Sequence, residues 1–344
     1  MIEFTERGLY CPAADVYIDP WRPVARALIT HGHSDHARFG HAAYLATESA
    51  APVIRHRLGD IAIETVRYGE VRHVGGVAIS FHPAGHIPGS AQIRLEKDGE
   101  IWVVSGDYKL EHDGVSEPFE PVRCHSFITE CTFGLPVFRW QRQADVMADV
   151  NAWWRECREA GRVAALGAYS LGKAQRIIAN LDCDIGPIFT HAAVEGVNEV
   201  LRAQGISLPP TRRVVPGMGK ADFAGGIVIA PPSALAGTWL GRFGGVSTAF
   251  ASGWMAVRGI RRRRGVDRGF VISDHVDWPG LDAAVRATGA GRIFVTHGYT
   301  SVFQRYLAEQ GYDAHVVSTE YEGETAGEPA RETVDAAPPS AEAG

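Results

Sequence analysis

The run from His31 to His36 constrains this chain more than any other segment. It reads His-Gly-His-Ser-Asp-His, so three imidazoles and a carboxylate lie within six residues, directly after the apolar stretch 27–30. A strand that ends in such a loop delivers these side chains to one point at the edge of a sheet. Nitrogen ligands suit one divalent ion and mixed nitrogen and oxygen ligands suit a second. The run therefore predicts a two-metal site.

Four other segments repeat the arrangement of an apolar strand followed by a side chain that can bind metal or transfer protons. They lead to Asp19 after residues 16–18, His86 after 81–85, Asp107 after 103–106 and His297 after 295–296. Gly85 and Gly106 stand directly before two of these residues and allow the backbone to turn closely around a site.

The composition is that of a globular protein. The 344 residues are 45% hydrophobic and 22% charged. No run of about 18 apolar residues occurs, so no membrane span is expected. The first residues lack the basic start and apolar core of a signal peptide, which favours a cytoplasmic protein. The five cysteines are odd in number and lack Cys-x-x-Cys spacing, so neither a disulfide framework nor a cysteine zinc site is expected.

The negative charge of the chain is concentrated at its end. From Glu320 onward seven acidic residues stand against one basic residue, Arg331, which accounts for the whole net charge of −6. Residues 1–319 are thus neutral as a group, and they contain the arginine-rich run 258–264. Such a local basic patch can bind a polyanion whatever the total charge.

The pattern along the chain changes twice. The first part predicts a short helix at 52–59, a strand at 77–82, and a hairpin of strands 91–96 and 101–105 around Asp98-Gly99. The middle part predicts strands and helices in alternation, which indicates a separate α/β domain over about 132–264. Its elements are a helix at 141–160, a strand at 163–168, a helix at 171–181, a strand at 187–190, a helix at 194–204 and a strand at 227–232. Strands at 269–273 and 292–296 follow, and the composition of 323–344 predicts a disordered acidic tail.

In this order the motifs resemble the metallo-β-lactamase superfamily, over about residues 8–322. The segment Thr129–Gly134 resembles the acidic motif that opens the inserted β-CASP domain, Ser273–Asp277 the histidine motif that closes it, and Val295–Gly298 the last motif. The β-CASP group consists of nucleic-acid-processing nucleases, among them Artemis-type DNA nucleases, ribonuclease J and the pre-mRNA cleavage endonuclease. The bacterial ligase-associated DNA exonucleases are most similar in length and motifs.

The resemblance implies an α/β fold, namely a metallo-β-lactamase αββα sandwich with an inserted β-CASP α/β domain. Residues 1–131 would form the first part of the sandwich, 132–264 the insert, 265–322 the second part, and 323–344 the tail. It also implies two divalent metal ions. Zinc is favoured by the histidine-rich set, and manganese suits the carboxylates.

The resemblance further implies a role for each matching residue. The first metal would be held by His31, His33 and His86, the second by Asp35, His36 and His297, with Asp107 as the bridging carboxylate. Asp19 would support the histidine-rich loop, although an Asp-Pro turn explains Asp19-Pro20 equally well. Glu130 and His275 would form an acid–histidine pair near the scissile phosphate, so the catalytic candidates are Asp35, Glu130 and His275.

The expected reaction is phosphodiester hydrolysis with a metal-bridged hydroxide as nucleophile and His275 as proton donor. A DNA exonuclease in repair or end processing is the first interpretation, with DNA (also single-stranded) as substrate, a functional association with a DNA ligase, and no membrane partner. Artemis-type DNA nucleases tend to lack the final histidine that this chain has in His297, so a β-CASP ribonuclease acting on RNA is the alternative. A small-molecule metallo-hydrolase is a third interpretation, and the basic run argues against it. A catalytically silent nucleic-acid-binding scaffold is a fourth, against which the intact ligand set argues.

Substrate contacts are expected from Ser170 and Lys173, which begin a helix after a strand, and from Arg261 and Arg262. Ser170 as a helix N-cap and the arginines as a solvated face are the structural alternatives. Trp254 suits core packing better than base stacking. Histidines outside the motif order are interpreted as structural, namely His41, His56, His73, His82, His112, His125, His191 and His315.

Overall fold

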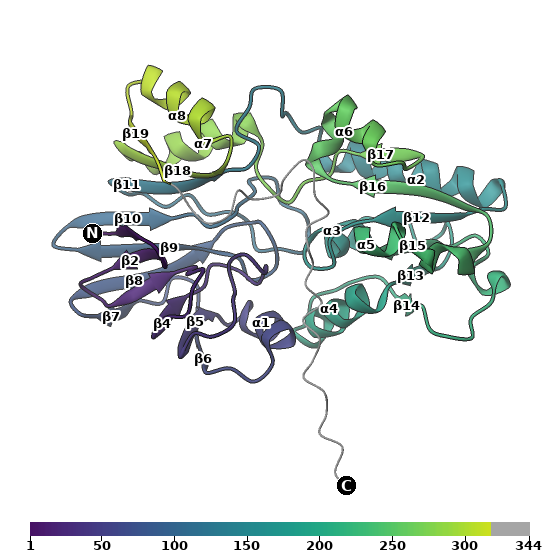
Figure 1. Ribbon diagram of the computed structural model, residues 1–344, viewed down its shortest axis with the longest axis horizontal. Helices are drawn as coiled ribbons and strands as arrows, with labels where there is room; N and C mark the ends of the chain where they lie inside the picture. The colour runs from purple at the N-terminus through teal and green to yellow at the C-terminus, as the bar shows by residue number, and fades with distance from the viewer. Residues whose placement is uncertain (318–344) are drawn as a thin grey trace, which may run out of the picture.

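Three β-sheets organise the chain, in a computed structural model that describes residues 1–317. Two sheets pack face to face in one body, and the third sheet with its helices forms a second body beside it (Figure 1). The fold is therefore α/β, as the sequence predicts. Among the described residues, no helix is both long and apolar enough to cross a membrane.

The first sheet has the strand order β1-β2-β3-β4-β5-β6. Its strands are β1 Glu3–Thr5, β2 Gly8–Cys11, β3 Val16–Ile18, β4 Arg26–Leu28, β5 Ala43–Thr47 and β6 Ile63–Val66. The first three are antiparallel, and β3 to β6 run parallel. Helix α1 (Ala51–Leu58) covers the outer face, where Ile54 and Leu58 pack against Ile29, Tyr44 and Ala46.

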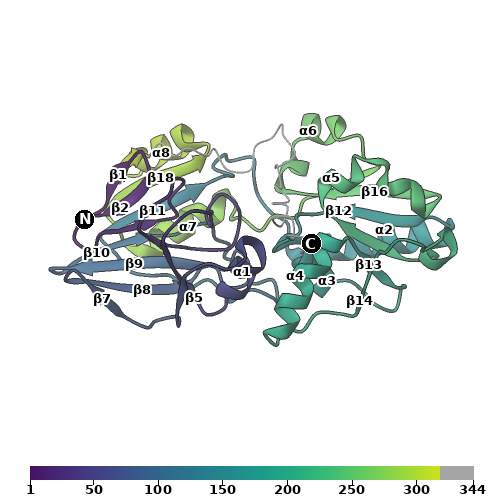
Figure 2. The ribbon, with the colours of Figure 1, turned by 60° about the horizontal axis from the view of Figure 1, so that its bottom comes forward.

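The second sheet brings the two ends of the chain together. Its order is β19-β18-β11-β10-β9-β8-β7. The strands are β7 Arg72–Val74, β8 Val77–Pro83, β9 Ala91–Lys97, β10 Glu100–Val104, β11 Ser126–Cys131, β18 Arg292–Gly298 and β19 Asp313–Val316. The late strand β18 pairs in parallel with β11, so the chain returns to this sheet after building the second body (Figure 2). Helices α7 (Trp278–Thr288) and α8 (Thr300–Glu309) cover its outer face.

One apolar core lies between these two sheets. Leu9, Val16 and Leu28 of the first sheet pack with residues of the second, including Phe81, Leu95, Val104 and Ile128. Burying a side chain of this kind stabilises the fold by about 1.5–3 kcal/mol. Apolar residues of this core occupy every second position of β8 and β9, which fixes the face of the second sheet that meets the first.

The third sheet is entirely parallel, in the order β14-β13-β15-β12-β16-β17. Its strands are β12 Val163–Gly167, β13 Ile188–Thr190, β14 Thr211–Arg213, β15 Ile227–Ala230, β16 Val246–Ala251 and β17 Arg268–Phe270. Its α-helices include α2 Gln143–Glu159, α3 Lys173–Ala179, α4 Ala192–Ala203, α5 Pro232–Leu235 and α6 Arg258–Arg263. Three 3-10 helices accompany them, namely η1 Lys220–Phe223, η2 Thr238–Phe243 and η3 Gly253–Ala256. Apolar clusters lie on both faces of the sheet, as a buried parallel sheet requires.

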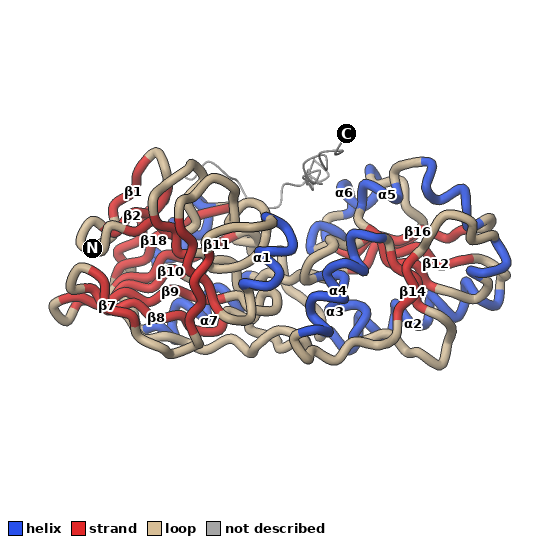
Figure 3. The backbone as a smooth tube through the Cα atoms, turned by 90° about the horizontal axis from the view of Figure 1, so that it is seen from below, coloured by secondary structure: helices blue, strands red, loops and turns tan. Residues whose placement is uncertain are grey.

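The two bodies meet along an apolar seam. Val53 of α1 and Ile87 pack against Leu171 and, from α4, Val197 and Leu201. Figure 3 shows α1 next to α4 at this junction. The seam fixes the loop before α3 next to the ends of the first two sheets.

Most predicted elements are confirmed, including the 91–105 hairpin, α1, α2, β12, α4 and β18. Three details differ. Strand β17 pairs with β16, so the third sheet extends past the expected boundary at 264 to Phe270. The arginine run forms the short helix α6. The helix expected at 171–181 begins only at Lys173, after Gly172, whose positive φ of 85° interrupts the helical backbone. The tail predicted at 323–344 lies outside the described residues.

Candidate metal centre

The carboxyl ends of strands from both face-to-face sheets meet at one point. Strands β3 and β4 end just before Asp19 and the His31–His36 run, and β8 and β10 end just before His86 and Asp107. A hydrogen bond from Ala91 N to Thr30 O, 2.8 Å long, joins the two sheets there. The predicted ligands therefore converge because these strands, two from each sheet, end side by side where the sheets meet.

Three histidines form the first set of facing nitrogens. His33 Nδ1 lies 3.1 Å from His31 Nε2 and 3.0 Å from His86 Nε2. The other ring nitrogens are already engaged. His33 Nε2 lies 3.2 Å from Leu171 O, and His86 Nδ1 lies 2.9 Å from Asp274 O.

This pattern identifies the protonation of the rings. A carbonyl oxygen only accepts, so His33 Nε2 and His86 Nδ1 carry the protons. The remaining nitrogens, His33 Nδ1 and His86 Nε2, then face each other at 3.0 Å. Facing lone pairs repel unless a cation lies between them. The set thus fits a metal ion on the chemistry of its donors.

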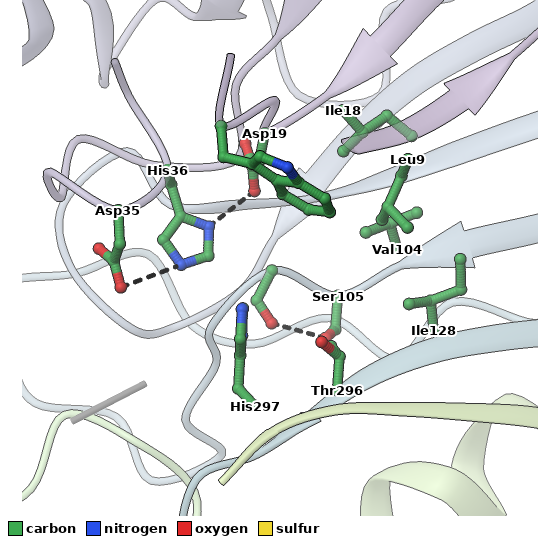
Figure 4. A pocket seen from close by; sticks show the side chains of 12 residues that line it. Leu9, Ile18, Asp19, Asp35, His36, Val104, Ser105, Ile128, Thr296 and His297 are labelled. Carbon is green, nitrogen blue, oxygen red and sulfur yellow. Dashed lines mark hydrogen bonds and ion pairs between the residues drawn. The ribbon is translucent and has the colours of Figure 1, made fainter. Parts of the chain in front are cut away.

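A second set lies beside the first. His36 Nε2 is 3.4 Å from Asp107 Oδ2 and 3.8 Å from Asp35 Oδ2, and His297 Nδ1 is 4.0 Å from Asp107 Oδ1. Figure 4 shows Asp35, His36 and His297 around the same pocket. Asp107 Oδ2 is also 3.6 Å from His31 Nε2, so this carboxylate lies between the two sets. His36 Nε2 and Asp107 Oδ1 are buried without a hydrogen-bond partner among the described residues, which again fits a bound cation.

Unusual backbone conformations aim two of these side chains. His297 has a φ of +56° and is the extra residue of a bulge, because Glu130 pairs with Thr296 while Cys131 pairs with Gly298. A bulge redirects a side chain that regular pairing would place elsewhere. Gly106 has the same φ, and a Cβ there would lie 2.7 Å from Thr30 Cβ, so only glycine allows this approach of the Asp107 loop.

Metal ligation requires deprotonated ligands, and three of these side chains meet that requirement. His36 does not, because burial lowers its pKa but Asp107, Asp35 and Asp19 raise it by more, to well above the usual value. Burial, followed by the neighbouring His275 and His33, lowers the pKa of His86 to about 3. Burial also holds the pKa of His31 well below its usual value. Burial raises the pKa of Asp107, but His36 and His275 lower it by more, so this carboxyl is ionised.

An acid–histidine pair adjoins the metal sets. His275 Nδ1 lies 2.9 Å from Glu130 Oε2 and 3.9 Å from Asp107 Oδ2. Glu130 Oε1 also accepts from Tyr108 N at 2.9 Å, which fixes the carboxylate. Burial lowers the pKa of His275, but the charges of Glu130 and Asp107 raise it by more, to about 10.

Several known proteins are similar in sequence to this chain. No family model matches the chain. A "Probable DNA ligase" from Opitutus terrae is 32% identical over 314 residues, which make up 90% of this chain and 30% of that protein. An "Endoribonuclease ysh1" from Aspergillus fumigatus is 30% identical over 125 residues, 35% of this chain and 14% of that protein. An "RNase J-like protein" from Methanocaldococcus jannaschii is 26% identical over 180 residues, 50% of this chain and 37% of that protein.

The chain belongs to the β-CASP group of the metallo-β-lactamase superfamily. It spans less than a third of the length of the first two relatives. The crystal structure of a protein of unknown function from Enterococcus faecalis V583 matches 87% of this chain and 80% of its own, with a TM-score of 0.59 and 11% identity, which shows a shared fold.

In this β-CASP protein the expected substrate contacts occupy two different places. Lys173 is buried, with Nζ 3.1 Å from Asp274 Oδ1 and 4.3 Å from the centre of the Tyr169 ring, so it lies next to the metal sets. Ser170 is also buried, and the N-cap of α3 is Gly172, not Ser170. Arg261 and Arg262 are exposed on α6. Trp254 packs in the core against Phe133, Phe138 and Tyr299, as expected.

Several residues of the centre carry no sequence signal of their own. Thr30 Oγ1 contacts Asp19 Oδ2 at 2.5 Å and His31 Nδ1 at 3.1 Å, and Asp274 O contacts His86. Their positions directly before His31 and His275 were the one available hint. Beside the second set, an open pocket has about 490 Å³ of unfilled space including its mouth, with Leu9, Val104 and Ile128 on its apolar wall (Figure 4).

Proposed function

We propose that the chain is a two-metal nuclease, and specifically a DNA exonuclease that processes ends in DNA repair. The observation that carries the proposal is the 3.0 Å approach of His33 Nδ1 to His86 Nε2, next to Asp107 and the Glu130–His275 pair. The DNA assignment is supported by the similarity to a protein named as a DNA ligase over most of this chain.

The proposal also assigns the layers. The two face-to-face sheets, with α1 outside one and α7 and α8 outside the other, correspond to the αββα sandwich. The third sheet and its helices correspond to the β-CASP insert. With β17 included, the insert covers 132–270, and the sandwich covers 1–131 and 271–317.

In this proposal His31, His33 and His86 hold one ion, Asp35, His36 and His297 hold the other, and Asp107 bridges them. Two divalent ions supply Lewis-acid polarisation of a phosphodiester and lower the pKa of water. The histidines favour zinc, whereas Asp35 and Asp107 also suit manganese.

The proton donor is His275. Glu130 accepts the proton of Nδ1, which orients the ring and leaves Nε2 to donate to the oxygen that leaves the scissile phosphate. The carboxylates that raise the pKa of His275 keep it protonated, and a nearby dication lowers that pKa again toward the range in which a general acid works. Asp19 orients His36 through a 2.7 Å contact to Nδ1.

Arg261 and Arg262, which are exposed on α6, would contact the phosphate backbone. Lys173 and Ser170 were expected to do the same, but both are buried at the loop that meets His33, and Lys173 is paired with Asp274, so neither side chain faces a phosphate here. Since the segment similar to this chain makes up 30% of the relative named as a DNA ligase, we include a functional association with a ligase in the proposal.

A β-CASP ribonuclease is the second candidate. It is favoured by His297, which lies within 4.0 Å of Asp107, and by relatives named as an endoribonuclease and an RNase J-like protein.

The decisive experiment compares end-labelled DNA and RNA of the same sequence, with Zn²⁺ or Mn²⁺ added. We expect wild-type protein to shorten DNA from an end and Asp107→Ala to be inactive. His73→Ala, at an exposed position on β7, serves as the control and should match wild type. Faster cleavage of RNA would favour the second candidate, and wild-type activity equal to that of Asp107→Ala on both polymers would refute both.

A further inference from the structure

Arg176 on α3 reaches out of the insert into the sandwich. Its side chain is buried, and its guanidinium donates from Nη1 to Ser273 O at 2.9 Å and from Nε to Asp113 Oδ2 at 3.1 Å. Nη2 lies 3.1 Å from the same carboxylate oxygen and 3.5 Å from His86 O. One side chain thus contacts three segments that are far apart in the sequence.

Asp113 is the anchor of this junction. Its Oδ1 accepts from Val115 N at 2.9 Å and Ser116 N at 2.7 Å, which closes its own loop. Its backbone oxygen accepts from Gln143 and Asn180 side chains at 3.3 Å, at the start of α2 and the end of α3. Arg176 is therefore held in place by a rigid loop of the sandwich and by its own helix.

The other two contacts lead directly to the metal centre. Ser273 O lies one residue before Asp274, whose backbone oxygen fixes the ring of His86. Ser273 Oγ accepts from His275 N at 3.1 Å. Arg176 thus holds the backbone on both sides of the contact that orients His86, at His86 O and at Ser273 O.

We propose that Arg176 is a positioning residue of the metal centre, which holds His86 in the orientation that binds the first ion and holds the segment of His275 against it. The inference rests on the proposed metal site. Arginine suits this role because its planar group donates in several fixed directions at once, whereas lysine offers a single charged nitrogen.

If Arg176 only stabilised the fold, its removal would affect stability but not metal binding. Removing Arg176 alone leaves the Asp113 carboxylate buried without its partner, which destabilises the fold whatever happens at the metal centre. Asp113→Asn removes that charge and keeps the amide oxygen that accepts from Val115 and Ser116. The double variant Arg176→Met/Asp113→Asn therefore restores stability without restoring the contacts to Ser273 and His86.

The test measures Co²⁺ binding by the full chain, from its visible absorption spectrum, together with urea unfolding. The variants are Arg176→Met, Arg176→Lys and the double variant. Arg202→Met is the matched control. Arg202 also contacts a carboxylate and a backbone oxygen, those of Glu195 at 2.9 Å and Pro209 at 2.7 Å, but both partners lie within the insert.

We expect the double variant to unfold near the wild-type urea concentration and to bind one Co²⁺ about 10–100-fold more weakly, as removal of an outer partner of a ligand typically does. Arg176→Lys should retain stability and show the same weakening, and Arg202→Met should bind Co²⁺ as wild type does. Wild-type Co²⁺ affinity in the double variant would overturn the positioning role while leaving the proposed function intact. Absence of Co²⁺ binding by wild type would overturn both.

Discussion

A single carboxylate, that of Asp19, fixes the ring of His36. Its Oδ2 lies 2.7 Å from His36 Nδ1, and its Oδ1 accepts from Thr30 N at 2.8 Å. Asp19→Asn tolerates the left-handed backbone at φ +43° but replaces one acceptor with an amide donor. We expect this variant to fold and to bind the second metal about 10–100-fold more weakly, measured as metal content after dialysis against graded chelator.

Asp15→Asn is the matched control for that prediction. Asp15 also has a positive φ, of +51°, and binds Tyr10 and Arg26 at the surface, away from the metal sets. Its metal content should equal that of wild type. If Asp19→Asn retained both ions at the same chelator concentration, the orienting role of Asp19 would be wrong.

His41 makes a pH-dependent contribution to stability. Both of its ring nitrogens are buried without a partner among the described residues. Burial lowers its pKa to about 4, with Asp19 raising it and Arg38 lowering it. The unfolded chain takes up this proton near pH 6.5, roughly the ordinary pKa of a histidine, and the folded chain does not. Stability is therefore lost as the pH falls from about 6.5 toward 4.

His41→Leu removes this titration. We expect the difference between the urea midpoints, variant minus wild type, to be larger at pH 5 than at pH 7.5. Midpoints that change in parallel for the two proteins would contradict the assignment. The sequence indicates only a structural role for His41, and the difference in midpoints measures that role.

At the scale of elements, α6 is a short helix with an unusual charge. Arg258, Arg261, Arg262 and Arg263 are exposed, and none forms an ion pair within residues 1–317. Replacing Arg261, Arg262 and Arg263 by alanine should weaken single-stranded DNA binding. In a plot of the logarithm of the binding constant against the logarithm of the salt concentration, the slope should become less steep by about 0.7 for each phosphate that the variant no longer neutralises.

This binding is measured by fluorescence anisotropy in an Asp107→Ala background, so that the DNA is not degraded. Arg305→Ala on α8 is the control, because Arg305 is equally exposed and is paired with Glu309. An unchanged slope in the triple variant would remove α6 from the proposed path of the nucleic acid.

Elements with local signals were predictable from the sequence. The hairpin of β9 and β10 follows from Asp98-Gly99, both of which adopt the positive φ that this turn requires. The bulge at His297 was not predictable, since it depends on how β18 pairs with β11. The helical form of the arginine run was missed because its charges repel along a helix and no apolar face marks it beyond Ile260.

At the scale of the whole molecule, the clustering of the proposed ligands was predictable from the sequence, and the contacts that support the cluster were not. His31 to His36 carry a dense local motif, whereas the Leu171 contact to His33 joins residues 138 positions apart and the Arg176 contact to Asp113 joins residues 63 apart. Such contacts arise only when the second body packs on the first through the α1–α4 seam. No local spacing encodes them.

The meeting of side chains from two sheets at the metal centre predicts how metal removal affects the stability of the fold. The two sets draw side chains from both face-to-face sheets, and His33 Nδ1 and His86 Nε2 lie only 3.0 Å apart. Ions that bind only the folded chain stabilise it by about 2.7 kcal/mol at 100 times the dissociation constant. We expect chelation to lower the thermal midpoint and added Zn²⁺ to restore it in calorimetry. Asp107→Ala should lose most of this response, and an equal response in both proteins would mean that the stabilising ions bind elsewhere.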